Sequence, residues 1–411
     1  MTTTKNNENK KLNFSNEREQ SQACLNSAEH EKNQGRKVLN VPNSTDKGNV
    51  IRNVPHLRFP EFQGEWEKKK MEECVDFLDG LRKPIKSEDR KSEKGLYPYY
   101  GASGIIDYID GFIFDGEYIL LSEDGANIID RNYRVAFIAK GKIWVNNHAH
   151  VLQPHNGFDI NFLSETLERL NYAVYNTGTT MPKLNQEVCR NINLKIPATK
   201  EQNKIGNLLS LLNERIATQN KIIDKLQSLI KGIAHLCIRD FTNDCEYVRL
   251  GDICKITTGK LDANAQVENG QYPFFTCAEQ PFNIDSYAFD TEALLISGNG
   301  ANLGYINYYK GKFNAYQRTY VLDHFSVNIQ YVKWALKVLL PPRIAIEKSS
   351  SNTPYIVLST LADLKIPIPN NSKQNQIADL MMSFERKLST QLALSDLYNK
   401  QKQYLLRQMF I

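Results

Sequence analysis

Leu121-Ser-Glu-Asp-Gly-Ala-Asn-Ile128 recurs, with small changes, as Ile296-Ser-Gly-Asn-Gly-Ala-Asn-Leu303. Each copy is an apolar run that ends in a turn rich in glycine and asparagine, which is the pattern of a short β-strand followed by a loop. The copies begin 175 residues apart in a chain of 411 residues, so one falls in each half. This pair predicts that the chain contains the same structural unit twice.

Four further matches occur in the same order in both halves. They are Tyr97-Pro-Tyr-Tyr-Gly with Tyr272-Pro-Phe-Phe-Thr, Gly141-Lys-Ile with Gly311-Lys-Phe, Leu194-Lys-Ile-Pro with Leu364-Lys-Ile-Pro, and Gln202-Asn-Lys-Ile with Gln374-Asn-Gln-Ile. The offset between matched blocks drifts between 170 and 175 residues. A duplicated unit whose loops have changed in length would produce this drift.

Short runs with β-forming composition, separated by turn residues, indicate strands in each copy. The predicted strands are Tyr118–Leu121, Arg134–Ala139 and Lys142–Val145 in the first copy, and Leu294–Ser297 and Tyr320–Leu322 in the second. A short helix is expected in each copy, over Asn161–Ala173 and Asn328–Leu339. The pattern therefore predicts a mixed α/β (α+β) fold with two globular domains, over residues 51–199 and 241–371.

Residues 1–50 have a different composition, with ten asparagines and one aromatic residue, Phe14. Such a segment cannot bury enough apolar surface to offset the entropy cost of ordering. We expect a disordered tail, for which the sequence suggests no role.

A long helix is predicted after each domain, over residues 200–240 and 372–411, because apolar residues recur there at alternating steps of three and four. The expected helix-pairing residues are Leu209, Leu212, Ile216, Gln219, Ile223, Leu226, Met381, Phe384, Leu388, Gln391 and Tyr398. About 38 helical residues make a rod of roughly 57 Å, longer than a domain of this size is wide. We expect the two helices to form an antiparallel coiled coil; the alternative is that each lies on its own domain.

Gln219 and Gln391 occupy equivalent seam positions near the middle of the two helices. In an antiparallel pair they would approach each other, and a polar residue in an apolar seam can fix register. The hypothesis is that this pair sets the register; the alternative is that glutamine is merely tolerated there.

Composition limits the classes of protein that need to be considered. Hydrophobic residues make up 41% of the chain, enough for packed cores, and the formal net charge is +5, too weak by itself to establish nucleic-acid binding. The seven cysteines include no CxxC pair, which favours reduced thiols over a disulfide framework or a zinc site. No segment resembles a signal peptide or a membrane span. We expect a cytoplasmic protein.

The arrangement resembles the specificity subunit of type I restriction–modification systems. The resemblance is carried by the segment Val54-Pro-His-Leu-Arg-Phe-Pro-Glu-Phe-Gln-Gly-Glu-Trp66, the two Leu-Lys-Ile-Pro blocks, and the helix starts at Glu201-Gln-Asn-Lys-Ile and Lys373-Gln-Asn-Gln-Ile. It covers about residues 51–411, and the order and duplication of these motifs make it specific.

The resemblance implies that each domain is a target-recognition domain that reads one half of a split double-stranded DNA target. The paired helices would then set the unread gap and dock two modification (methyltransferase) subunits, with restriction (motor-nuclease) subunits completing the complex. S-adenosylmethionine, ATP and magnesium are expected on those partners and no cofactor on this chain.

Signatures of catalysis are absent from the sequence. It contains no Asn-Pro-Pro-Tyr/Phe type of sequence, no S-adenosylmethionine-binding loop and no GxxxxGK[ST] phosphate loop. His148 and His150 could suggest a metal pair, but the equivalent stretch Ala315–Tyr320 has no histidine. We therefore expect no metal site and no catalytic residue, and we interpret the two histidines as strand residues with polar tips at or near a DNA surface.

Basic and amide side chains in equivalent loops of the two copies are the candidates for DNA binding, because lysine and arginine neutralise phosphates and arginine, asparagine and glutamine read base edges. The candidates are Arg82, Lys83, Lys86, Arg90, Arg131, Asn132, Arg134, Lys183, Lys260, Asn299, Asn302, Gln317, Arg318 and Lys348, with Lys91, Lys255, Asn264 and Asn352 beside them. Any single one of them could be a solvated surface charge.

Two alternative functions stay open. The first is a non-catalytic scaffold whose two domains bind protein or carbohydrate. The second is an enzyme with an undetected active site, such as a nuclease, although no pair of carboxylates recurs in both copies.

Overall fold

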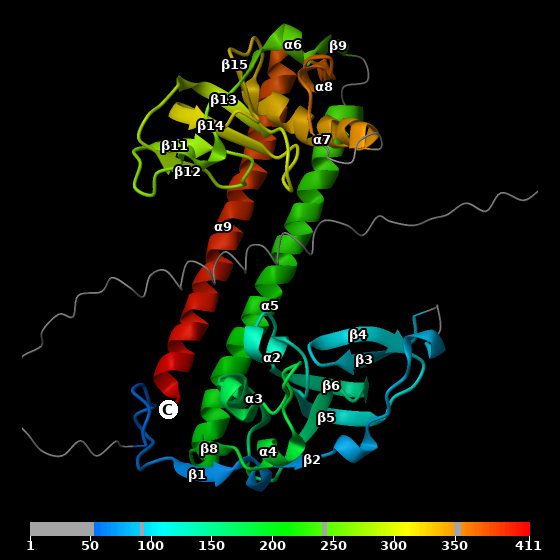
Figure 1. The fold of residues 1–411 in the computed structure, drawn as a ribbon, viewed down its shortest axis with the longest axis vertical. Helices are drawn as coiled ribbons and strands as arrows, with labels where there is room; N and C mark the ends of the chain where they lie inside the picture. The colour runs from blue at the N-terminus through cyan, green and yellow to red at the C-terminus, as the bar shows by residue number, and fades with distance from the viewer. Residues whose placement is uncertain (1–52, 91–93, 241–244, 349–354) are drawn as a thin grey trace, which may run out of the picture. The chain divides into compact units, whose positions relative to one another are not determined.

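The computed structural model describes residues 53–90, 94–240, 245–348 and 355–411. The predicted tail, Lys91 and Asn352 lie outside the described residues. The chain divides into two compact units, one formed by Met1–Asn213 with Gln401–Ile411 and the other by Glu214–Lys400. Each unit contains a mixed sheet and segments of two long helices (Figure 1).

The first unit is built on a six-stranded sheet with the strand order β2-β7-β5-β6-β3-β4. The strands of the whole unit are β1 (Glu67–Lys70), β2 (Val75–Phe77), β3 (Tyr97–Gly101), β4 (Gly104–Ile109), β5 (Phe114–Ser122), β6 (Ala136–Val145), β7 (Ala149–Pro154) and β8 (Asn193–Ile196). Of these, β1 and β8 pair with each other outside the six-stranded sheet. Its helices are η2 (Met71–Glu73), η3 (Asp79–Leu81), η4 (Ser87–Asp89), α2 (Asn127–Asp130), α3 (Ile160–Glu168), η5 (Tyr172–Tyr175), α4 (Gln186–Arg190) and the first part of α5 (Thr199–His235). Neighbouring strands of the sheet are antiparallel except β3 and β6, which are parallel.

The second unit repeats this sheet with the order β10-β15-β13-β14-β11-β12. Its strands are β9 (Glu246–Arg249), β10 (Lys255–Thr258), β11 (Tyr272–Phe275), β12 (Phe282–Ile284), β13 (Phe289–Ser297), β14 (Ile306–Ala315), β15 (Thr319–Asp323) and β16 (Lys365–Ile368). Its helices are η6 (Leu236–Asp240), α6 (Leu250–Ile253), η7 (Ala263–Ala265), α7 (Ile329–Lys348), α8 (Leu358–Ala362) and most of α9 (Asn371–Met409). The parallel pair is again the equivalent one, β11 with β14, so the predicted duplication is confirmed at the level of topology.

The central strand of each sheet has two buried faces. In β5, Ile119 and Leu121 face a core that contains α3, whereas Leu120 faces the opposite core of the sheet. In β13 the alternation is the same, with Leu294 on one side and Leu295 on the other. Alternate side chains of a strand point to opposite faces, so a continuous apolar run indicates a strand buried on both sides.

The prediction of two strands over residues 134–145 was wrong, because β6 is one continuous strand of ten residues. Gly141, which lies between the two predicted strands, has φ of 81° and pairs with Gly116 inside the β5–β6 ladder. Glycine adopts a positive φ at low cost, so the strand continues through this position. The second unit has the same device, Gly311 with φ of 132° within β14.

The predicted bounds of the two short helices also needed correction. Helix α3 ends at Glu168, and a separate 3-10 turn begins at Tyr172. Helix α7 continues to Lys348, beyond the predicted end at Leu339, and contains Pro341 and Pro342. Buried Ile344 packs in the core of the second unit, so apolar packing sustains the helix beyond the prolines.

The long helices pack against each other in antiparallel fashion within each unit. In the second unit Leu226 and Ile230 of α5 share a core with Met381 of α9. In the first unit Leu209 of α5 shares a core with Leu406 near the other end of α9. Rising residue numbers on α5 pair with falling numbers on α9, which confirms the predicted antiparallel coiled coil.

A buried glutamine fastens the start of each long helix to its domain. In the first unit Gln202 accepts a hydrogen bond from the Asp159 backbone N–H at 3.1 Å and donates to the Pro197 carbonyl at 2.8 Å. Gln374 makes the equivalent bonds in the second unit, to Asn328 and Pro369. This is the physical basis of the repeated Gln-Asn motif.

Six cysteines lie in the part of the chain that the structure describes, and all six are free thiols. None of the helices in these residues combines the length and the apolar character that crossing a membrane requires.

Candidate functional site

Loops from distant parts of the sequence contact one another in each unit. In the first unit they are residues 78–90, 123–134, 146–148 and 176–184; in the second, residues 259–265, 298–304 and 316–318. The isolated bridges Asp124–Lys183 and Leu261–Tyr316 join these loops within their own units. We call each group the loop cluster of its unit. Most of the candidate DNA-binding residues fall within these clusters.

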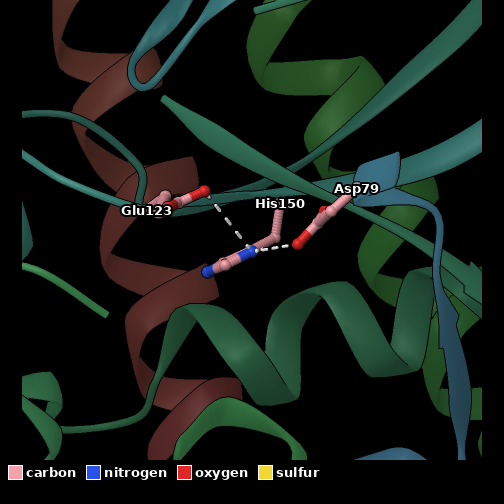
Figure 2. A group of neighbouring side chains, drawn as sticks. All are labelled: Asp79, Glu123 and His150. Atoms are coloured by element: carbon pink, nitrogen blue, oxygen red, sulfur yellow. Dashed lines mark hydrogen bonds and ion pairs between the residues drawn. The ribbon is translucent and has the colours of Figure 1, made fainter. Parts of the chain in front are cut away.

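Asp79, Glu123 and His150 form a compact charged group in the loop cluster of the first unit (Figure 2). His150 Nδ1 lies 2.6 Å from Asp79 Oδ2 and 3.7 Å from Glu123 Oε2. The other ring nitrogen, Nε2, lies 2.9 Å from the carbonyl oxygen of Leu184. Arg82 Nη1 donates to Glu123 Oε2 at 2.6 Å and to the Ala149 carbonyl at 2.7 Å.

The protonation of this group follows from its contacts. Burial by itself lowers the pKa of His150, but the hydrogen bond and charge of Asp79, together with the neighbouring Cys189 thiol, raise that pKa to about 10. Burial raises the pKa of Asp79, and the contact with His150 more than reverses this, so that the pKa of Asp79 is lowered overall. His150 is therefore an imidazolium that donates from both nitrogens.

These contacts make the group a closed ion-pair network rather than a set of free metal ligands. Both nitrogens of His150 are engaged, and Glu123 is paired with Arg82 and, at 3.5 Å, with Lys183. The expectation that His150 lies at or near a surface is wrong, because its side chain is 1% exposed. His148 is the exposed member of the pair, at 51%.

In the second unit a neutral side chain makes the bond to a backbone carbonyl that His150 makes in the first unit. Tyr320, which is equivalent to His150 in the register of the sheet, donates through its hydroxyl to the Ile356 carbonyl at 2.8 Å. Cys277 Sγ lies 3.0 Å from Asn299 Oδ1, and Asn302 Nδ2 donates to the Cys277 carbonyl at 3.1 Å. The loop cluster of the second unit is thus joined by neutral hydrogen bonds.

Four arginines predicted to bind DNA lie in ion pairs within the first unit. Their partners are Glu123 and Asp79 for Arg82, Asp107 for Arg90, Glu168 for Arg131 and Glu165 for Arg134. Arg131 has a left-handed backbone, with φ of 57°, and also bonds to the Glu168 carbonyl. These contacts give each guanidinium a structural role, and their DNA contacts stay predictions.

The remaining candidates differ in exposure. Lys83, Lys86, Asn132, Lys183, Lys255, Lys260, Asn264, Gln317 and Arg318 are exposed, whereas Asn299 and Asn302 are half-buried. Gln317 donates to Asp262 Oδ1 at 2.8 Å. Lys348 is the last residue of α7, and its side chain lies outside what the structure describes.

The predicted aromatic blocks lie mostly in the cores. Tyr99 of β3 and Phe274 of β11 are buried, and the Tyr99 hydroxyl accepts a hydrogen bond from the Ile85 backbone N–H at 2.9 Å. Because these two rings are buried, they pack in the core and are not exposed to a ligand.

Each helix-pairing candidate is buried or half-buried within its own unit. Leu209, Gln219, Ile223, Leu226 and Met381 are buried, and Leu212, Ile216, Phe384, Leu388, Gln391 and Tyr398 are half-buried. Gln219 Nε2 donates to Gln391 Oε1 at 2.8 Å, so the structure brings the two predicted glutamines together.

Sequence reasoning missed the carboxylates that organise these sites, namely Asp79, Glu123, Glu165 and Glu385. Asp79, Glu165 and Glu385 occur in no motif, and Glu123 lies in the repeated Leu121–Ile128 block at a position where the second copy has Gly298. Each receives a partner from a distant part of the chain, as Glu385 does from Lys333 at 2.7 Å. A sequence signal for Asp79 would have been its position just after β2, opposite a histidine of β7, which is too weak to identify it.

Comparison with known families gives two matches to one family model. Residues 63–228 and residues 242–394 each match the model described as type I restriction modification DNA specificity domain. Together the matched residues cover most of the chain, and each match falls on one copy of the duplicated unit.

Individual relatives carry the same description. The chain is 44% identical over 136 residues to the type I restriction enzyme EcoDI specificity subunit of Escherichia coli, covering 33% of this chain and 30% of that protein. It is 35% identical over 148 residues to a putative type I restriction enzyme specificity subunit of Haemophilus influenzae, covering 36% and 37%. The matched region thus spans about a third of the length of each of these two relatives.

The fold matches a solved structure over nearly its full length. The crystal structure of a type I restriction–modification system S subunit from M. genitalium superposes with a TM-score of 0.69 at 18% identity, covering 87% of this chain and 99% of that one. At this identity the match shows a shared fold.

Proposed function

We propose, from the premise that this chain belongs to the type I restriction–modification DNA specificity family, that it recognises a bipartite sequence in double-stranded DNA. In this proposal each unit reads one half-site and the paired helices α5 and α9 set the unread gap between them. The chain docks two modification subunits, which methylate adenine, and restriction subunits, which cleave DNA. The chemistry of S-adenosylmethionine, ATP and magnesium belongs to those partners.

The observation that carries the proposal is the combination of one sheet topology in two copies with unlike side chains at equivalent loop positions. The loop clusters are built on equivalent strands, yet Glu123 in one unit corresponds to Gly298 in the other. A shared scaffold with divergent loops is what two readers of different short sequences require.

The helices support the part of the proposal that concerns spacing. Helix α5 has 37 residues and α9 has 39. At a rise of 1.5 Å per residue each is a rod of roughly 55 Å. A helix pair with a fixed register is stiff, so it can keep the gap between half-sites constant.

The absence of catalysis is part of the proposal. The most concentrated set of ionisable groups in the described loops, around His150, is a closed network in which each carboxylate already has a cationic partner. A general base or a metal centre needs a group that can exchange its partner for substrate or ion.

The test is to map methylated adenines in a host that expresses the full chain with its modification subunits. We expect one motif with two short defined segments separated by an undefined gap of fixed length. A host with the modification subunits alone is the control. A continuous motif would contradict the bipartite target, and methylation without sequence preference would contradict recognition altogether.

Binding measurements separate this function from its alternatives. Affinity of the assembled complex for random duplex DNA should fall steeply with salt, because phosphate contacts release counterions. An affinity for DNA that does not vary with salt concentration would favour a scaffold that binds protein or carbohydrate. Specific cleavage of a plasmid by the isolated chain with magnesium would instead indicate a nuclease.

A further inference from the structure

The turn that joins β6 to β7 in the first unit, and the turn that joins β14 to β15 in the second, are held in the same way. The turn of the first unit, residues 146–148, begins where the Asn146 backbone N–H donates to the Tyr100 carbonyl at 3.0 Å. In the second unit, the turn of residues 316–318 begins where Tyr316 donates to the Phe275 carbonyl at 2.9 Å. The two turns therefore start at equivalent places in the fold.

The turns also end at equivalent hydrogen bonds. The Glu123 backbone N–H donates to the His148 carbonyl at 2.9 Å, and the Gly298 N–H donates to the Arg318 carbonyl at 2.8 Å. A Cβ atom on Gly298 would lie 2.4 Å from that carbonyl oxygen, so the second unit has no room for a side chain where the first unit has Glu123. The structure thus identifies His148 and Arg318 as one position of the fold, carrying different side chains.

Both side chains project from a fixed backbone into solvent. His148 and Arg318 are exposed, while the residues that follow them, Ala149 and Thr319, are buried. A side chain of this kind can reach a ligand without a rearrangement of the main chain, which lowers the entropy cost of binding.

Arg318 differs from the four predicted arginines of the first unit in lacking an acidic partner. Among the side chains that the structure describes, no carboxylate lies within ion-pair distance of its guanidinium. Its five N–H donors are therefore available to a ligand.

His148 is held in one orientation by an acidic neighbour. Its Nδ1 lies 2.9 Å from both carboxylate oxygens of Asp124, so Nδ1 carries the proton and donates. The other ring nitrogen, Nε2, is left for a ligand. An oriented imidazole offers one directional hydrogen bond, where the guanidinium offers two parallel ones.

We propose that position 148 of the first unit and position 318 of the second are equivalent base-reading positions, and that Arg318 recognises a guanine. The inference rests on the proposed function. An arginine that bonds to O6 and N7 of guanine in the major groove makes the commonest specific contact between protein and DNA. His148 contributes a single hydrogen bond to a base of the other half-site, so the same turn reads two unlike sequences.

The experiment compares methylation motifs of the assembled complex carrying Arg318→Ala or His148→Ala. We expect Arg318→Ala to relax discrimination about 5- to 150-fold at one base pair of one half-site and to leave the other half-site unchanged. His148→Ala should relax one base pair in the opposite half-site. Because both residues are exposed, thermal unfolding should be close to that of the parent chain.

The duplication supplies matched controls. Lys140 and Lys310 occupy equivalent positions in β6 and β14, and both are exposed cations paired to glutamates, Glu117 and Glu292. Lys140→Ala and Lys310→Ala each remove a positive charge from the strand that precedes the turn. Both variants should leave every position of the methylation motif unchanged.

The outcomes are distinguishable from a failure of the proposed function. If the parent complex methylates without a defined motif, the proposed function fails. If the parent motif is defined and Arg318→Ala keeps it unchanged, this inference fails. A uniform loss of affinity on all sequences, with a shallower dependence on salt, would identify Arg318 as a phosphate contact and would also overturn base reading.

Discussion

Gln219 Nε2 donates to the side-chain Oε1 of Gln391 at 2.8 Å and to its backbone carbonyl at 3.0 Å. Gln219 is 4% exposed, so this hydrogen bond is buried in a seam whose other positions are mostly apolar. Beside it, Ser395 Oγ lies 3.2 Å from Asn220 Oδ1. Hydrogen bonds of this kind are satisfied in one register only, because a shift of either helix would leave buried polar atoms without partners.

Replacing both glutamines by leucine should raise thermal stability and loosen the register. The double variant removes both polar partners together, which is neutral or stabilising, whereas Gln219→Leu alone leaves Gln391 unsatisfied and should cost about 1–3 kcal/mol. Thermal unfolding gives the stability, and methylation mapping gives the gap between half-sites. A gap preference that stays as narrow as that of the parent complex would refute the register hypothesis.

His150 should make the stability of the first unit depend on pH in the alkaline range. Its pKa is raised in the folded state to about 10 from 6.5, so the stabilisation is complete below about pH 6.5 and is lost as pH rises toward 10. His150→Gln should cost about 1.5–3 kcal/mol at neutral pH, the worth of a hydrogen bond to a charged group.

Chemical denaturation at several pH values checks this prediction. The difference in the free energy of unfolding between the parent and His150→Gln should shrink between pH 6.5 and pH 10. Tyr320→Phe is the matched control, because it removes the equivalent bond to a carbonyl in the second unit without removing a charge. An unchanged difference across this range would show that the imidazolium is not the stabilising species.

Glu165 should be among the most costly residues to remove from the first unit. It is 3% exposed and lies 2.7 Å from Arg134, 3.0 Å from Asn213 and 3.3 Å from Lys402. Glu165→Leu leaves two partly buried cations unpaired and should destabilise the unit by about 3–5 kcal/mol. Glu117→Ala, which removes an exposed pair, is the control and should cost less than about 1 kcal/mol.

The same carboxylate predicts acid sensitivity. Burial raises the pKa of Glu165, but the charges of Arg134 and Lys402 lower it below 4.5 overall. Its stabilisation is therefore present above pH 4.5 and is lost as pH falls through the lowered pKa. The free energy of unfolding of Glu165→Leu should accordingly depend less on pH in this acidic range than that of the parent chain.

In the second unit, the ion pair between the short helix of the domain and α9 has its charges reversed. In the first unit the carboxylate, Glu165, lies on α3 and the cation, Lys402, on α9. In the second unit Lys333 and Lys337 of α7 contact Glu385 of α9 at 2.7 and 3.1 Å. Glu385→Lys should destabilise the unit by about 1.5–3 kcal/mol, because it replaces charged hydrogen bonds by like-charge contacts.

Reversing both sides tests the origin of that loss. Glu385→Lys combined with Lys333→Glu and Lys337→Glu should recover most of the stability, and a double-mutant cycle gives the coupling energy. Recovery of none of the loss would place the effect in packing of the lysine stems on Trp334 rather than in charge.

Much of the fold could be predicted from the sequence because the duplication conserves what builds the scaffold. Apolar runs that alternate between two cores, the Leu-Lys-Ile-Pro strands and the Gln202 and Gln374 contacts are local patterns that appear twice. The errors arose where a local rule was outweighed, as at Gly141, whose positive φ fits inside a ladder, and at Pro341, beyond which packing extends α7.

The sequence by itself determined that there are two units, their shared topology and the seam of the helices, because these follow from periodic burial of apolar side chains. The roles of charged residues were decided only by the tertiary structure. Arg82 and Arg318 are indistinguishable as basic loop residues, yet one lies in ion pairs with Asp79 and Glu123, while no described carboxylate lies within ion-pair distance of the other. The energy of a charge depends on its burial and on partners from distant segments, and both arise only when the chain has folded.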